Sequence, residues 1–149
     1  MATRATYSFS GFPEQPSQQP QCHLYLHHDG FPTGAAWRFA ASLRHGGAVE
    51  RFLAGFRHTQ TEAIELASVA EAADADYRYS LRLQAWVHPS IEVQCWRRHP
   101  ATRTWHPRCG PMRLRAFMQR FLPGEPAERS ELSDAGPADG PPETPPARG

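Results

Sequence analysis

The amino-acid sequence predicts an α+β domain, in which an antiparallel sheet of two hairpins, about four strands, carries three to four helices on one face. Apolar and polar residues alternate in two pairs of segments, at residues 5–10 and 22–27 and at residues 77–84 and 91–98, which is the period of half-buried strands. Between these two pairs and after the second pair, apolar residues recur at helical spacing. The chain of 149 residues is 40% hydrophobic, which is enough for one domain with a core.

The first hairpin opens the chain. Residues 5–10 alternate between apolar and small polar side chains, and residues 22–27 do the same. Residues 11–21 are rich in Pro and Gln, and we expect them to form the long loop that joins the two strands.

A tight turn and a helix follow. Asp29 can hydrogen-bond the backbone two residues on, and Gly30 accepts a positive φ, so the pair is typical of a turn. Pro32 disfavours the α conformation in the residue before it, and the helix is therefore expected to begin no earlier than about Thr33. A glycine pair at residues 46–47 ends this helix.

Two further helices are predicted before the second hairpin. The apolar residues of segment 49–56 repeat at i, i+3, i+4 and i+7, which indicates the first of them. For the second helix, Thr59 with Glu62 resembles a capping box, and the apolar residues between 64 and 70 form its apolar side.

The second hairpin comprises residues 77–84 and 91–98, joined by a turn at residues 88–90. A loop follows this hairpin. Pro111 then occupies a position typical of the first helical residue, and the apolar stripe of a last helix runs to Phe121.

The chain divides into one domain and a tail. Residues 1–122 form the predicted domain, and residues 123–149 are predicted to be a disordered tail, because Leu132 is their only large apolar residue. The tail holds six acidic residues and two arginines, whereas residues 78–120 hold nine arginines and one acid. The net charge of +1 therefore conceals a strongly basic region. All sixteen basic residues of the chain are Arg, whose guanidinium group binds carboxylate and phosphate bidentately.

Two short motifs resemble a known family. The residues that carry them are Thr3, Arg4 and Ala5, and then Tyr25, His27, Asp29, Gly30, Phe31, Pro32 and Gly34. They are similar to a family of small proteins from phages, prophages and other mobile elements, which has a Thr-Arg-Ala/Ser start and a Tyr-x-His-x-Asp-Gly-Tyr-Pro-x-Gly segment. Phe31 stands where the family has Tyr, so a role of that hydroxyl is absent from this chain. The resemblance implies a mobile-element setting and, by analogy, an inhibitor of host defence such as an anti-CRISPR protein.

The adjacent residues His27, His28 and Asp29 are candidates for a metal site or a general base, because imidazole and carboxylate are usual ligands and proton carriers. Consecutive strand residues point to opposite faces, so the two imidazoles do not reach one ion without a bulge. We therefore predict a structural motif, in which the aspartate caps the turn while glycine and proline set its geometry. Its residues are His27, His28, Asp29, Gly30, Phe31, Pro32 and Gly34.

The three cysteines, Cys22, Cys95 and Cys109, are predicted to be free thiols, since their number is odd and no C-x-x-C pair occurs. The first two share the phase of apolar strand residues and are expected in the core, whereas the third lies in a predicted loop. Together with His99 and His106, Cys109 gives three metal ligands in a spacing that matches no familiar zinc site. We predict no catalytic residue, no metal and no cofactor.

The outward face of the second hairpin, with the loop after it, is the strongest candidate for partner binding. Arg and Trp are enriched at binding hot spots, and they also suit single-stranded nucleic acid, where bases stack on indoles and phosphates bind guanidinium groups. The alternative is a solvated strand face with tryptophans half buried beneath the last helix. The predicted residues are Arg78, Arg82, Trp86, Trp96, Arg98, Arg103, Trp105 and Arg108.

These observations favour a binding protein over an enzyme, because neither a nucleophile elbow nor a phosphate-binding glycine loop occurs. Combined with the resemblance, they predict a phage or mobile-element protein that inhibits a host defence complex of the CRISPR type by steric occupation. Its partner would be a host protein or ribonucleoprotein complex. The alternative is a nucleic-acid-binding accessory protein that uses the same Arg/Trp face. No leader and no membrane-spanning apolar run is found, which favours a cytoplasmic protein.

Overall fold

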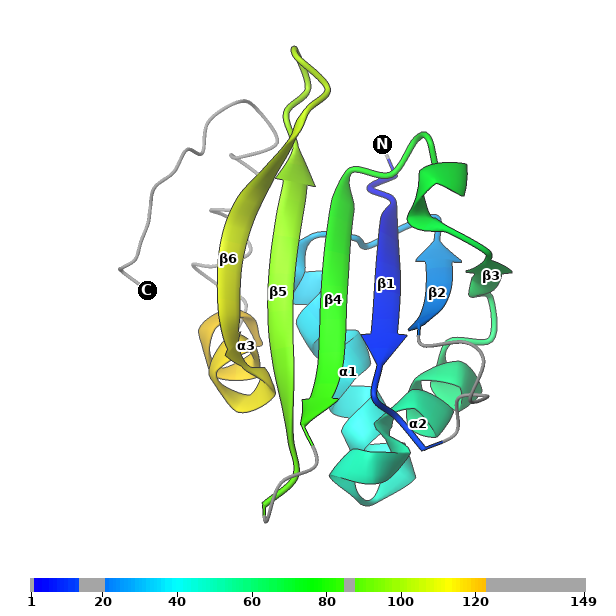
Figure 1. Ribbon diagram of the computed structural model, residues 1–149, viewed down its shortest axis with the longest axis vertical. Helices are drawn as coiled ribbons and strands as arrows, with labels where there is room; N and C mark the ends of the chain where they lie inside the picture. The colour runs from blue at the N-terminus through cyan, green and yellow to red at the C-terminus, as the bar shows by residue number, and fades with distance from the viewer. Residues whose placement is uncertain (1, 14–20, 85–87, 123–149) are drawn as a thin grey trace.

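The computed structural model describes residues 2–13, 21–84 and 88–122, and it places helices on one face of a six-stranded sheet (Figure 1). The elements in chain order are β1 Ala5–Ser10, β2 Gln21–Leu26, α1 Pro32–Gly46, the 3-10 helix η1 Val49–Arg51, α2 Phe52–Thr59, β3 Ile64–Leu66, the 3-10 helix η2 Val69–Glu71, β4 Tyr77–Gln84, β5 Ser90–Arg98, β6 Trp105–Arg113 and α3 Leu114–Phe121. The α+β class is thereby confirmed. The predicted tail at residues 123–149 and Trp86 lie outside the described residues.

The sheet is mixed, which corrects the predicted antiparallel arrangement. Its strand order is β3-β2-β1-β4-β5-β6, and β1 pairs with β4 in parallel while all other neighbours are antiparallel. The reason is the connection. After β2 has run antiparallel to β1, the helices α1 and α2 carry the chain across the sheet, and β4 enters beside β1 in the direction of β1 (Figure 1).

The prediction of a helix after Thr59 is wrong, because this segment forms the short edge strand β3 and the single 3-10 turn η2. The Thr59 hydroxyl does not cap a new helix. It donates to the Gly55 carbonyl at 2.8 Å inside α2, and β3 then pairs antiparallel with β2.

The loop predicted after β5 is also wrong in its second half, where the chain forms the edge strand β6. Pro111 lies inside β6 and not at a helix start, and α3 begins at Leu114. Prolines are tolerated there because an edge strand has one side without a pairing partner. Together with β3, this strand accounts for six strands where about four were predicted.

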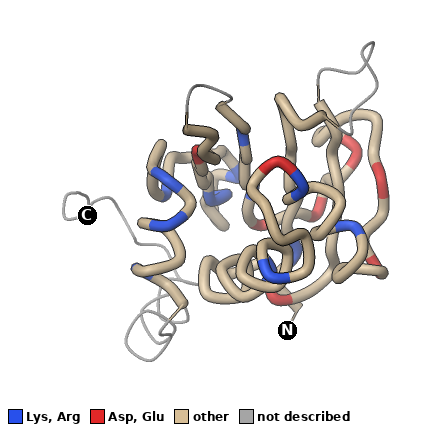
Figure 2. Tube along the Cα trace, turned by 90° about the horizontal axis from the view of Figure 1, so that it is seen from below, with Lys and Arg blue, Asp and Glu red and all other residues tan. Residues whose placement is uncertain are grey.

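Aromatic side chains form the core between the sheet and the helices. Tyr7 of β1 stacks on Tyr79 of β4 with ring centroids 5.1 Å apart, and Phe39 of α1 meets the edge of Tyr7 at 6.0 Å. Phe39 also lies 5.6 Å from Phe117 of α3, so one side chain joins both helices to the sheet. Each such buried ring contributes roughly 1.5–3 kcal/mol by burial. Figure 2, viewed from below, shows the helices gathered on one side of the strands.

The other face of the sheet carries no helix in the described part of the chain. Only the segment that contains η2 crosses one end of this open face, where Ala72 and Ala75 pack on Tyr25 of β2, with Trp105 at the edge of the cluster. None of the described helices is long and apolar enough to cross a membrane.

The packing of α2 on α1 leads to a stability prediction. A Cβ atom on Gly55 would collide with the backbone carbonyl of Ser42. We expect Gly55→Ala to lower the free energy of unfolding by about 1–3 kcal/mol, because α2 must move away from α1. Urea unfolding followed by circular dichroism measures this change. Arg44→Ala, at an exposed position of α1, is the control and should stay within about 0.5 kcal/mol of the parent; equal values for the two variants would contradict the close approach.

Candidate functional site

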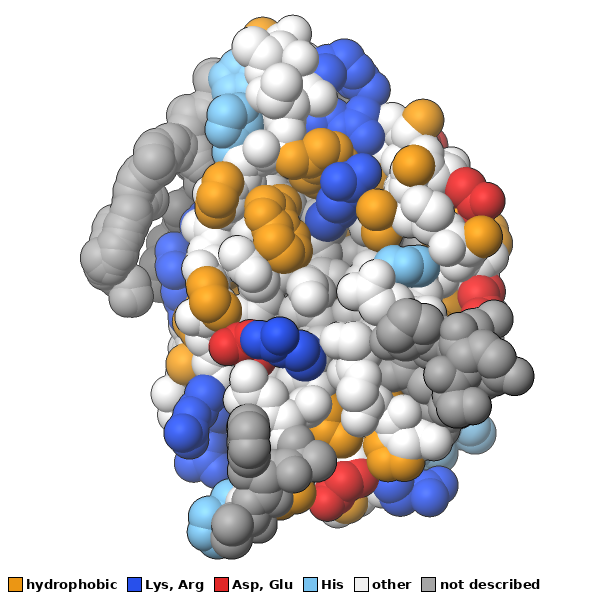
Figure 3. All heavy atoms as spheres, viewed as in Figure 1, with side chains coloured by type: hydrophobic (Ala, Val, Ile, Leu, Met, Phe, Trp, Pro, Cys, Tyr) orange, Lys and Arg blue, Asp and Glu red, His pale blue; other side chains and the backbone are white. Residues whose placement is uncertain are grey.

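The open face of the sheet brings together most of the residues predicted to bind a partner. Along β4, Tyr77, Tyr79 and the following leucines are buried toward the helices, so the alternating Arg78 and Arg82 point to the open face. The register then continues the pattern across the neighbouring strands, because Arg78 lies opposite Trp96 and Arg98 lies opposite Trp105. Figure 3 shows basic and hydrophobic side chains interleaved on this face above β4 to β6.

At one end of this face, a tryptophan ring lies close to two arginines. The guanidinium carbon of Arg78 lies 4.2 Å from the centroid of the Trp105 ring, and that of Arg98 lies 4.9 Å from it. Arg98 is held in place because its Nη1 donates to the Ala73 carbonyl at 2.7 Å, and Arg103 reaches the same carbonyl at 3.4 Å. We call Arg78, Arg98, Arg103 and Trp105 the basic cluster.

The arginines of the basic cluster repel one another. Burial lowers the pKa of Arg78, and the nearby Arg98 charge lowers it further. Burial also lowers the pKa of Arg98, followed by the charge of Arg103, while the nearby charges of Asp76 and Asp74 act in the opposite direction. Among the described residues, no carboxylate forms an ion pair with these three arginines. An anionic group that docks here would relieve the repulsion, so the cluster is suited to an acidic partner.

Other predicted residues lie elsewhere. Arg82 is on the open face, but its Nη2 pairs with Glu92 at 2.6 Å. Arg108 lies toward the helices, with its guanidinium carbon 5.8 Å from the Phe121 ring of α3, so it does not share the open face. The tryptophan Trp105 lies on the open face and not beneath α3, which corrects the alternative of tryptophans under the last helix.

The predicted turn motif forms a second site, at the junction of β2 and α1. Here Asp29, and not Gly30, takes the left-handed conformation, with φ 56°. Gly30 is required for a different reason, since a Cβ atom would lie 2.9 Å from the Thr3 carbonyl oxygen. Gly34 is required as well, because a Cβ atom there would collide with the Asp29 carbonyl. The helix α1 begins at Pro32, one residue before the predicted start.

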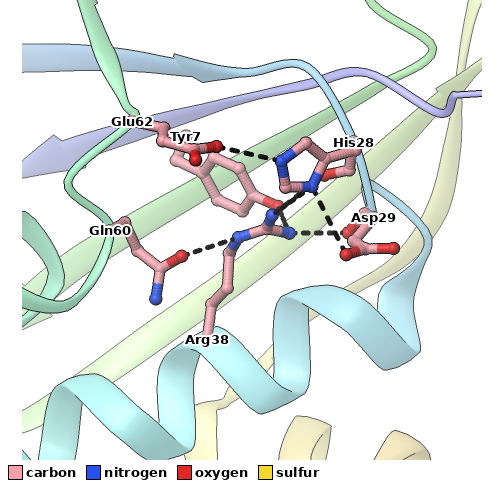
Figure 4. Close-up of polar contacts among 6 residues, drawn as sticks. All are labelled: Tyr7, His28, Asp29, Arg38, Gln60 and Glu62. Atoms are coloured by element: carbon pink, nitrogen blue, oxygen red, sulfur yellow. Dashed lines mark hydrogen bonds and ion pairs between the residues drawn. The ribbon is translucent and has the colours of Figure 1, made fainter.

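The residue that holds this turn is Arg38 of α1, which is only 7% exposed. Its Nη1 donates to the Asp29 carbonyl at 2.7 Å, and its Nη2 donates to the His28 carbonyl at 2.9 Å. Its Nε donates to Gln60 Oε1 at 3.0 Å, and Nη1 also points at the Tyr7 hydroxyl at 3.4 Å (Figure 4). One buried guanidinium therefore joins the turn, the sheet and the end of α2.

The two histidines of the motif have separate surroundings. The His27 ring meets the edge of Tyr25 at 4.7 Å between centroids. His28 lies between two carboxylates, with Nε2 3.1 Å from Glu62 Oε1 and Nδ1 3.4 Å from Asp29 Oδ2 (Figure 4). No group of three His, Cys, Asp or Glu side chains in the described ranges is placed to hold a metal ion.

Two of the three cysteines lie where nucleophilic chemistry is disfavoured. Cys22 and Cys95 are buried, as the strand pattern predicts. Burial raises the pKa of the Cys95 thiol well above its usual value, and a hydrogen bond with Cys109 raises it further. Cys109 lies in β6, opposite Cys95, and not in the loop where the sequence analysis had placed it.

Sequence reasoning missed the residues that complete the second site. Thr33, Trp37, Arg38 and Gln60 line a pocket together with the turn, yet none of them belongs to a motif. The available signal was spacing, because residues 33, 34, 37 and 38 follow the i, i+1, i+4, i+5 pattern of one helix face that begins at the turn.

Comparison with known proteins adds no name to these sites. No protein-family model matches the chain, and neither a curated protein nor a solved structure shows significant similarity to it.

Arg38 leads to a second stability prediction. We expect Arg38→Leu to lower the free energy of unfolding by at least about 2–4 kcal/mol, because it leaves the carbonyls of His28 and Asp29 without their donor. The exposed Arg44→Leu is the control, with a change below about 0.5 kcal/mol. Urea titrations of both variants measure the difference. If Arg38→Leu proved as stable as the control, the guanidinium would have no structural role.

The buried Tyr7 hydroxyl leads to a pH prediction. Burial raises the pKa of Tyr7 to about 12, despite the opposing charge of Arg38. The unfolded chain ionises this phenol near pH 10, so the stability it supports is complete below pH 10 and is lost as the pH rises toward 12, by about 2–3 kcal/mol. Unfolding free energies measured from pH 9 to 12 should show this decline, and Tyr7→Phe should reduce its slope. An unchanged slope in Tyr7→Phe would contradict the assignment.

Proposed function

We propose that this chain is a binding protein that docks through the basic cluster on an acidic surface of a host macromolecule and acts by steric occupation. The observation that carries the proposal is the Trp105 indole close to Arg78 and Arg98 on a sheet face without helices. An indole and two guanidinium groups offer stacking, apolar contact and bidentate hydrogen bonds within one small area.

The charge distribution supports an acidic partner. In the described chain, five of the acidic residues lie in the connection from α2 to β4, whereas the arginines gather over β4 to β6 and on α3 (Figure 2). These acidic residues are Glu62, Glu65, Glu71, Asp74 and Asp76. Asp74 and Asp76 lie near Arg98, but arginines outnumber acidic residues over β4 to β6, so a partner that approaches these strands meets a net positive surface, which accelerates encounter with a negative one.

The setting that we propose comes from the resemblance of the turn motif to proteins of phages and mobile elements. Small proteins of such elements often inhibit host defence, and a defence complex of the CRISPR type is the partner that we propose. Such ribonucleoprotein complexes expose both phosphate and acidic protein surfaces, and either one suits the basic cluster.

Charge reversal in the basic cluster tests this proposal. A bacterial strain whose CRISPR system blocks a phage should become sensitive when it expresses this chain. We expect Arg78→Glu/Arg98→Glu to abolish this effect, because each reversed hot-spot charge is expected to weaken binding by about thirty-fold or more. Plaque counts and co-purification of the defence complex measure the two outcomes.

The matched control is Arg44→Glu/Arg51→Glu, which changes the net charge equally at two exposed positions on the helix side. This variant should protect the phage as the parent does. Thermal unfolding of both variants confirms that they fold. The proposal fails if the folded Arg78→Glu/Arg98→Glu protein still protects the phage.

The second candidate function is direct binding of single-stranded nucleic acid. It is favoured by Trp96 and Trp105 on adjacent strands of the open face, because bases stack on aromatic rings displayed by a sheet.

Salt dependence distinguishes the two candidates. If the chain binds nucleic acid, a gel shift with a single-stranded oligonucleotide should weaken steeply as salt increases, with about one counterion released for each phosphate contacted. The Arg78→Glu/Arg98→Glu variant should reduce that salt slope. A chain that binds only a protein gives no shift at any salt concentration.

A further inference from the structure

We infer that the pocket between the turn and α1 is a second binding site, specific for a small organic anion with an aromatic or apolar body. The pocket has a volume of about 530 Å³, within the roughly 300–1,000 Å³ of small-molecule sites. It lies on the helix side of the sheet, so this inference does not depend on the proposed function of the open face.

The floor of the pocket carries a buried positive charge. Arg38 is bound by backbone carbonyls and by the Gln60 amide, and no carboxylate of the described chain forms an ion pair with it. The contact from its Nη2 to His28 Nδ1 is 3.5 Å, which is at the limit of a hydrogen bond. This N–H therefore has bonding capacity left for an anion, and a buried cation without a counter-charge is stabilised by one.

A second polar group in the pocket has no partner. Thr33 is 6% exposed and lines the pocket, and its Oγ1 is buried without a hydrogen-bond partner among the described residues. Buried hydroxyl groups are normally hydrogen-bonded, so this unpaired hydroxyl, in a residue that lines the pocket, has a donor left for a ligand group or a water molecule. Thr33 also lies in the first turn of α1, which has no acidic residue and no side-chain cap, and the N-terminal end of a helix favours negative charge.

The rim of the pocket supplies the apolar surface. Trp37 is 57% exposed and is the most exposed of the large hydrophobic side chains in the described residues. It lines the pocket together with Phe31. An exposed indole beside a recessed cation is suited to a ligand whose charged head enters the pocket while its aromatic or apolar body covers the indole.

The carboxylates of Asp29, which lines the pocket, and of Glu62 do not change this assignment. Asp29 and Glu62 are directed to solvent, with side chains 75% and 76% exposed, and both lie beside the imidazole of His28 (Figure 4). Their charges are therefore screened by water, whereas the charge of Arg38 is buried and acts at short range.

Matched aromatic ligands that differ in charge test the inference. The probes are phenylacetate, phenyl phosphate, 2-phenylethylamine and 2-phenylethanol, added to the full chain labelled with ¹⁵N. We expect one or both anions to shift the amide signals of residues 28–38, with the tighter one identifying the head group, and the amine and the alcohol to bind at least about ten-fold more weakly.

Two substitutions separate binding from folding. Thr33→Val keeps the shape of the side chain and removes a hydroxyl that has no protein partner, so the melting temperature should be unchanged or raised. The same substitution should weaken binding of the anion by about ten-fold. Trp37→Ala alters an exposed side chain and should weaken the binding of every aromatic probe. Ile64→Ala, at the other exposed large hydrophobic residue, is the control and should not affect binding.

Three results would overturn the inference. The first is that 2-phenylethylamine binds more tightly than either anion, which would show that the pocket prefers cationic ligands. The second is that no probe shifts the signals of residues 28–38. The third is that Thr33→Val binds phenylacetate and phenyl phosphate as tightly as the parent.

Discussion

The buried guanidinium of Arg38 is the contact on which the arrangement of the layers depends. It donates to the carbonyls of His28 and Asp29 after β2 and to Gln60 after α2, and it approaches the Tyr7 hydroxyl in β1. A leucine at this position would fill a similar volume but would leave both backbone carbonyls without a donor, so the hydrogen bonds, and not the charge alone, stabilise the turn. The guanidinium fixes the orientation of the turn relative to α1, because its planar N–H donors meet both carbonyls in only one arrangement. That placement forms the pocket.

The sheet separates two surfaces of different character. On the helix side, the turn and α1 enclose a pocket with one buried cation, where shape and desolvation select a ligand. On the open face, the arginines beside Trp105 form no ion pair with a carboxylate among the described residues, and we propose that their charge attracts a large partner. The pocket and the basic cluster have no residue in common. Substitutions of Arg78 or Arg98 are therefore expected to act independently of substitutions of Thr33 or Trp37.

The strands could be predicted where one face is buried and the other is exposed to solvent, because apolar and polar residues then alternate in the sequence. The alternation in β1, β4 and β5 predicted the correct strands, and α1 ends at the predicted glycine pair, with Gly47 as its cap at φ 79°. The edge strands β3 and β6 could not be predicted in this way. β3 has only three residues, and β6 has no regular alternation of burial, because its register with β5 is irregular. Period-two patterns also do not identify the neighbour of a strand, so the parallel pairing of β1 with β4 was beyond them.

The candidate sites show the same limit for side chains. Arg78 and Arg98 could be grouped from the sequence because strand alternation assigns them to one face. Trp105 was added only as part of the predicted loop, and the direction of Arg108 depends on the irregular pairing of β6. Arg38 was missed for a physical reason. An arginine on an amphipathic helix is normally solvated, and it becomes buried here only because the Asp29 backbone adopts a positive φ and presents two consecutive carbonyls to it. The same turn that the sequence marks as structural is therefore what converts a surface arginine into the floor of a pocket, so its structural role and its binding role have one origin.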